Sequence, residues 1–79
     1  MSNKEKYDNS FLSALSIKKD VIKNKLEYNS IPEWDSIGHM SLISELEKNF
    51  NISIETDDVI DFSSYDKGKE ILKKYKVII

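Results

Sequence analysis

The 79-residue chain contains no cysteine and no arginine, and it has only two glycines and one proline. Without cysteine, the chain itself can form no disulfide, no thiolate metal site and no thiol nucleophile. Without arginine, it lacks the guanidinium fork that grips carboxylates and phosphates bidentately. The scarcity of glycine and proline favours helices over a turn-rich sheet protein. These absences disfavour a self-sufficient enzyme and favour a module that acts with other proteins.

The charge balance and the apolar pattern narrow the class of protein further. A formal net charge of −2 has the wrong sign for a nucleic-acid binder. No apolar run approaches the ~20 residues that cross a bilayer. Residues 1–8 are polar and lack the apolar core of a secretory signal. We therefore expect a cytoplasmic monomer with one domain over residues 1–79, and no nucleic-acid or membrane partner.

Apolar residues at three- and four-residue spacing predict an all-α fold. The first helix is expected over about residues 2–15, where Ser2 and Glu5 are spaced as in a capping box. The strongest pattern predicts a helix over about 36–50. The apolar residues that step along one face of this helix are Ile37, Met40, Ile43, Leu46 and Phe50.

Two weaker patterns follow in the last third of the chain. Thr56 is expected to cap a short helix over about 57–61. Ser63 with Asp66 is typical of a capping pair and predicts a last helix over about 64–75. Three longer helices and one short helix would then surround a single core.

A long connector joins the first two predicted helices, over residues 16–34. Its apolar residues follow no clean period, so we expect a loop pinned to the core, with a turn of helix near 19–23. Trp34 is expected to pack over this connector as an anchor at an exposed end. The apolar tail over 77–79 could complete the packing of the last helix or lie on a neighbour. The expected architecture is an irregular four-helix bundle with a long first loop.

The segment over residues 33–40 reads Glu-Trp-Asp-Ser-Ile-Gly-His-Met and opens the strongest helix. Its Asp35-Ser36-Ile37 tripeptide resembles the Asp-Ser-Leu signature of the carrier-protein family, the acyl and peptidyl carriers that bear a 4′-phosphopantetheine arm. The pattern over 40–52 is similar to the second helix of that family and its exit. The resemblance covers about residues 10–75 and is greatest to stand-alone carriers of specialised biosynthetic pathways.

The resemblance implies an acyl-carrier-like bundle that has no catalytic residues of its own. Ser36 would be the attachment point, esterified with the phosphopantetheine of coenzyme A by a separate phosphopantetheinyl transferase that recognises Asp35. The arm would hold acyl, hydroxyacyl or aminoacyl groups as a thioester. Its other partners would be an acyl- or aminoacyl-loading ligase and a downstream transferase or synthase. The residues expected to dock these partners are Ile37, His39, Met40, Glu45, Glu47, Asp57, Asp58 and Asp61.

Other interpretations of the same residues remain open at this point. Ser36 could serve only as a helix cap, and the chain could be a helical adaptor that uses its acidic surface without an arm. Ser36 and His39 are close enough on a helix to form a nucleophile–base pair, but a hydrolase also needs an orienting acid, an oxyanion hole and a pocket. One histidine among scattered carboxylates lacks the spacing of metal ligands, so no metal site is expected.

Overall fold

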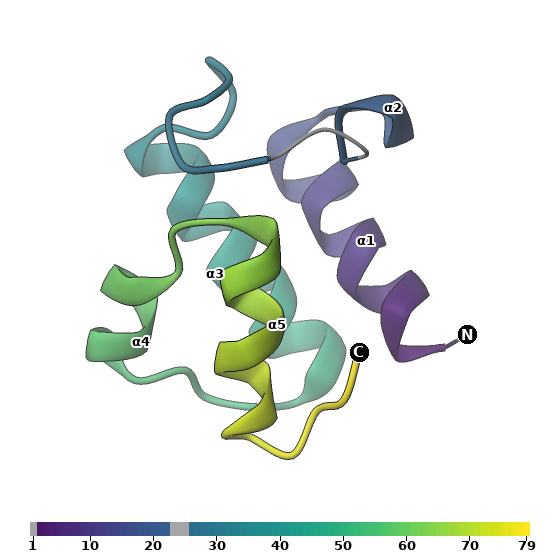
Figure 1. Ribbon diagram of the computed structural model, residues 1–79, viewed down its shortest axis with the longest axis vertical. Helices are drawn as coiled ribbons and strands as arrows, with labels where there is room; N and C mark the ends of the chain where they lie inside the picture. Colours follow the sequence, from purple (N-terminus) through teal and green to yellow (C-terminus); the bar gives the residue numbers. More distant parts are fainter. Residues whose placement is uncertain (1, 23–25) are drawn as a thin grey trace.

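The computed structural model describes residues 2–22 and 26–79, and in this part of the chain the regular structure is helical, without strands. The all-α class expected from the sequence is therefore confirmed for these residues. Figure 1 shows α5 crossing in front of α3, with α1 on one side of this pair and α4 on the other. The helices are α1 (Asn3–Leu15), α2 (Lys19–Ile22), α3 (Ser36–Phe50), α4 (Thr56–Asp61) and α5 (Tyr65–Lys73).

The hydrogen bonds at the helix starts confirm the predicted capping residue of α1 but not those of α4 and α5. At α1, Ser2 accepts from the Glu5 N–H at 3.1 Å, and the Glu5 side chain reaches back to Ser2 as a capping box requires. Thr56 is the first residue of α4 rather than its cap, and the residue before it makes no side-chain cap bond. The start of α4 was therefore predicted one residue too late.

The start of α5 differs from its prediction because two adjacent serines compete for the cap. Ser64 takes the extended cap conformation and accepts from the Lys67 N–H at 2.9 Å. Ser63, which the sequence favoured, instead uses its carbonyl oxygen to accept from the Tyr28 N–H at 2.9 Å. The cap is thus set by a contact with a distant segment.

The connector between α1 and α3 is held against the α4–α5 junction. The Tyr65 N–H donates to the Leu26 carbonyl at 2.9 Å, and Glu27 forms an isolated antiparallel bridge with Ser64. Earlier in the connector, α2 supplies the helical turn expected near 19–23, although Lys23 lies outside the described residues. The connector is therefore a pinned loop, as its scattered apolar residues indicated.

Aromatic side chains from α1, the connector and the segment after α4 meet in the core around Phe11. The Phe11 ring centroid lies 5.0 Å from that of Tyr7 and 5.5 Å from that of Trp34. Trp34 is fully buried, so its expected exposure was wrong, whereas its packing in the core agrees with the expected role as a structural anchor. The other buried apolar residues are Leu15, Leu26, Leu42, Ile43, Leu46, Ile54, Phe62, Ile71, Leu72 and Val77. Because Val77 packs in this core, the apolar tail completes the fold.

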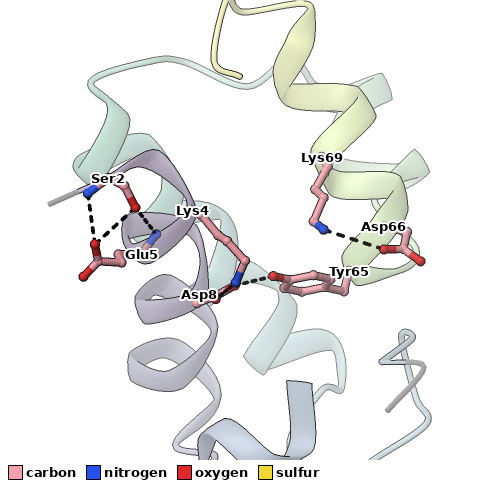
Figure 2. A network of polar contacts seen from close by, with 7 residues as sticks. All are labelled: Ser2, Lys4, Glu5, Asp8, Tyr65, Asp66 and Lys69. Atoms are coloured by element: carbon pink, nitrogen blue, oxygen red, sulfur yellow. Dashed lines mark hydrogen bonds and ion pairs between the residues drawn. The ribbon is translucent and has the colours of Figure 1, made fainter. Parts of the chain in front are cut away.

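Polar contacts join α1 to α5, as Figure 2 shows, and a further hydrogen bond joins α1 to the end of the chain. The Tyr65 hydroxyl donates to Asp8, which also pairs with Lys4 at 2.8 Å. The buried Tyr7 hydroxyl donates to the Tyr65 carbonyl at 2.6 Å, and burial raises the pKa of this hydroxyl above its ordinary value. The Asn3 side chain donates to the Ile78 carbonyl at 3.0 Å, which places the C-terminal tail beside the start of α1, as Figure 1 also shows.

Gly68 has a packing role that outweighs its poor helix propensity. A Cβ atom at this position would lie 2.2 Å from both the Phe62 ring and the Tyr7 hydroxyl oxygen. A larger residue therefore requires α5, the Phe62 ring or the Tyr7 side chain to shift.

We expect Gly68→Ala to lower the free energy of unfolding by about 1–3 kcal/mol, the usual cost of overpacking a core. Urea denaturation followed by the fluorescence of the single tryptophan measures this change. Lys67→Ala, at the exposed neighbouring residue, is the control and should stay within about 0.5 kcal/mol of wild type. A stabilisation by Gly68→Ala of up to ~1 kcal/mol, as helix propensity alone predicts, would contradict the packing role.

Candidate functional site

Asp35 caps the N-terminus of α3, so the hydroxyl of the next residue, Ser36, is not used as the cap. The Asp35 carboxylate accepts from the Gly38 N–H at 2.8 Å, and its backbone carbonyl accepts from the His39 N–H at 2.8 Å. A Cβ at Gly38 would lie 2.1 Å from the Glu33 carbonyl oxygen, so glycine is required for this tight entry. Ser36 therefore begins the helix without capping it.

Ser36 is exposed at the mouth of an open groove between α1 and α3. Its Oγ lies 3.1 Å from the hydroxyl oxygen of Tyr28, a residue of the connector. Two apolar side chains beside it are also in solvent, since Ile37 is 79% exposed and Met40 is 57% exposed. The groove is lined by Ser13, Ala14, Ser36, Ile37, Met40, Ser41, Ser44 and Glu45.

His39 lies half-buried and uses both of its ring nitrogens inside the fold. The Trp34 indole N–H donates to His39 Nδ1 at 2.9 Å, and the two rings stack with 20° between their planes. His39 Nε2 lies 2.8 Å from the Val59 carbonyl oxygen of α4. Because Nδ1 accepts and a carbonyl can only accept, these partners assign the neutral tautomer with hydrogen on Nε2.

This arrangement argues against two roles of His39: the docking role that was expected, and the pairing with Ser36 that the sequence already disfavoured. A side chain with both nitrogens engaged by Trp34 and Val59 has no ring nitrogen to present to a docking partner. For the same reason it cannot take a proton from Ser36, so the two residues do not form a nucleophile–base pair in this conformation. The structure gives His39 an internal role, which is to join the connector, α3 and α4.

The acidic residues expected to form a docking surface do not share one environment. Asp58 is buried and accepts from the Tyr75 hydroxyl at 2.6 Å and from Lys74 Nζ at 2.9 Å. The bond from Tyr75 and the bond and charge of Lys74 lower the pKa of the Asp58 carboxyl. Asp58 therefore fastens α4 to the end of α5 and is removed from the docking surface.

The remaining predicted acids fall into two groups. Glu47 is half-buried and accepts from the Ile54 N–H at 2.9 Å, which closes the loop after α3. Glu45 lines the groove next to Ser36, while Asp57 and Asp61 are exposed on α4. The surface that carries free acidic groups is smaller than the sequence indicated.

Two residues of the site were missed from the sequence. Tyr28 lies in a connector without periodicity, so no pattern predicted its contact with Ser36. Ile60 is 73% exposed on α4, whereas an apolar residue in a short helix is ordinarily expected to face the core. Both residues line a largely apolar pocket of about 240 Å³. Its lining residues are Tyr28, His39, Val59, Ile60, Phe62 and Ser63.

Comparisons of the chain with protein-family models, with curated proteins and with solved structures found no match. Within residues 2–22 and 26–79, no group of three histidine or carboxylate side chains could hold a metal ion. In the same part of the chain, no helix has the length and apolarity needed to cross a bilayer. A function for this chain is therefore inferred from the residues around Ser36.

We expect His39→Ala to lower the free energy of unfolding by about 1–3 kcal/mol, because the buried Trp34 N–H loses its acceptor. Urea denaturation monitored by tryptophan fluorescence measures the loss. Met40→Ala, at the exposed neighbouring position, is the matched control and should change stability by less than about 0.5 kcal/mol. Equal stabilities of the two variants would show that His39 is a solvated surface residue.

A second prediction concerns the pH dependence of the Asp58 contact. Since the folded state lowers the pKa of Asp58, the resulting stability is present above the unfolded-state pKa of about 3.9 and is lost as pH falls through the folded-state value. Asp58→Asn should thus be less stable than wild type at neutral pH, with the gap narrowing in acid. Urea denaturation between about pH 7 and about pH 2.5 tests this, with Asp57→Asn as the control for loss of one charge. A gap that is independent of pH would contradict the assignment.

Proposed function

We propose that this chain is a carrier protein whose Ser36 bears a 4′-phosphopantetheine arm for acyl, hydroxyacyl or aminoacyl groups. The observation that carries the proposal is that Asp35, and not Ser36, caps the start of α3. Asp35 makes the cap bond to Gly38, so the Ser36 hydroxyl is left exposed at the first helical position. A serine kept only for capping would occupy the position that Asp35 holds.

The surroundings of Ser36 suit a phosphodiester. The first N–H groups of an α-helix lack partners within the helix, and the positive end of the helix dipole favours an anion there. At α3 the N–H groups of Gly38 and His39 already bond to Asp35, whereas those of Ser36 and Ile37 have no such capping bond among the described contacts. The Asp35 carboxylate, which would repel a phosphate, is directed to the Gly38 N–H.

A phosphopantetheinyl transferase would attach the arm to Ser36, with coenzyme A as the second substrate. A bond forms between Ser36 Oγ and the phosphorus that bears the pantetheine group. The pyrophosphate bond of coenzyme A breaks, and adenosine 3′,5′-bisphosphate leaves. The proton of the serine hydroxyl passes to a base of the transferase. The attached group supplies the thiol that this cysteine-free chain lacks.

Exposed apolar side chains on α3 and α4 fit recognition by partner enzymes. Ile37 and Met40 on α3 and Ile60 on α4 are all well exposed, although most large apolar side chains of the chain are in the core. Apolar anchors of this kind provide much of the binding energy at protein interfaces. The transferase, a loading ligase and a downstream acyltransferase or synthase would each use this surface.

Incubation of the purified chain with coenzyme A and a broad-specificity phosphopantetheinyl transferase should add one phosphopantetheine group, measured by intact-protein mass. Ser36→Ala should abolish the addition, because Ser36 is the only serine in the first turn of α3. Ser53→Ala removes an exposed hydroxyl from the loop after α3, outside the groove, and should be modified like wild type. The proposal fails if wild type stays unmodified under conditions that load a known carrier, as an adaptor without an arm would.

A further inference from the structure

The hydroxyl of Tyr28 lies 3.1 Å from Ser36 Oγ, and this contact joins the connector to the first residue of α3. The two residues are eight positions apart in the sequence, so helix geometry does not explain the contact. At 37% exposure, the Tyr28 side chain is placed at the surface rather than in the core. Its polar end nevertheless points at the one hydroxyl that the proposed function requires.

The backbone of Tyr28 is fixed on both sides. Its N–H donates to the Ser63 carbonyl at 2.9 Å, and the next N–H, from Asn29, donates to the Trp34 carbonyl at 2.9 Å. Asn29 takes the left-handed conformation with φ of 66°, which asparagine tolerates better than most residues. These bonds hold the loop against the α4–α5 junction and against the start of α3.

The ring of Tyr28 is held as well. It packs edge-on against His39, with centroids 5.4 Å apart, and against Trp34, with centroids 6.5 Å apart. His39 is itself fixed by its bonds to Trp34 and Val59. The hydroxyl of Tyr28 is therefore a preorganised group, since neither its backbone nor its ring has to be ordered when Ser36 reacts.

We propose that Tyr28 is the positioning residue of Ser36: it orients the serine hydroxyl for modification and then donates a hydrogen bond to the attached phosphate. This inference rests on the proposed function. In the unmodified chain either hydroxyl can donate to the other. Once Oγ is an ester oxygen it has no hydrogen, so Tyr28 must be the donor, to that oxygen or to a free phosphate oxygen. A charged acceptor strengthens this hydrogen bond.

The test compares Tyr28→Phe with wild type in steady-state modification by the transferase. Phenylalanine keeps the ring contacts with Trp34 and His39 and removes only the hydroxyl. We expect kcat to fall about threefold to tenfold, the range for loss of one neutral hydrogen bond, with KM for the chain changed by less than about twofold. Tyr75→Phe is the matched control, because it removes a hydroxyl that bonds to Asp58 and Glu55 instead.

A second measurement uses wild-type protein and is independent of how the variants fold. In proton NMR spectra, attachment of the arm should shift the ring resonances of Tyr28 and leave those of Tyr75 unchanged. A third measurement does use the variant: in phosphorus NMR spectra of the modified proteins, Tyr28→Phe should shift the phosphodiester resonance relative to wild type, and an unchanged resonance would contradict the hydrogen bond to the phosphate.

The outcomes separate the two proposals. Failure of wild type to accept the arm overturns the carrier function, and with it the role of Tyr28. Normal modification of wild type, with unchanged kcat for Tyr28→Phe and no response of the Tyr28 ring to the arm, overturns the role of Tyr28 alone. An increase in KM with unchanged kcat would make Tyr28 a docking contact for the transferase, which also contradicts positioning.

Discussion

A buried indole N–H must find an acceptor, and in this chain that requirement organises the region around Ser36. Trp34 is fully buried in the aromatic core, and its Nε1 donates to His39 Nδ1. His39 in turn meets the Val59 carbonyl through Nε2. One imidazole thus joins the connector, α3 and α4. An unsatisfied donor in this core would cost on the order of 1–3 kcal/mol, a large fraction of the stability of a small domain.

The same contacts determine where the start of α3 lies and what surrounds it. Because Trp34 is immersed in the core, the next residue, Asp35, emerges in position to cap the helix, and Ser36 follows in solvent. Tyr28 packs on the Trp34–His39 pair and brings its hydroxyl to Ser36. A rigid support below and an open groove beside the serine suit a residue that is modified by one enzyme and then serves several others. Such a site needs no enclosed cleft. A chain of 79 residues has a small core and could hardly form one.

The parts of this fold that local sequence controls could be predicted, and those that depend on distant contacts could not. The capping box of α1 and the apolar face of α3 are set by neighbours three or four residues apart, so both helices were found at nearly their observed bounds. The burial of Trp34 depends on Phe11 and Phe62, which lie far away in the sequence. Asp58 looked like any other surface acid because only the fold brings Tyr75 and Lys74 to it. The contact of Tyr28 with Ser36 depends on the connector being pinned to Ser63 and Trp34.

The mass of the protein as its own cell makes it shows whether Ser36 carries a phosphopantetheine arm. Mass spectrometry of the undigested protein purified from that cell should show an added phosphopantetheine, with or without cargo. Fragmentation of the protein in the spectrometer should place the added mass on Ser36. The mass of any further group would also identify the chemical class of the cargo. A native population that has the unmodified mass throughout, or that carries the added group on another residue, would contradict the account.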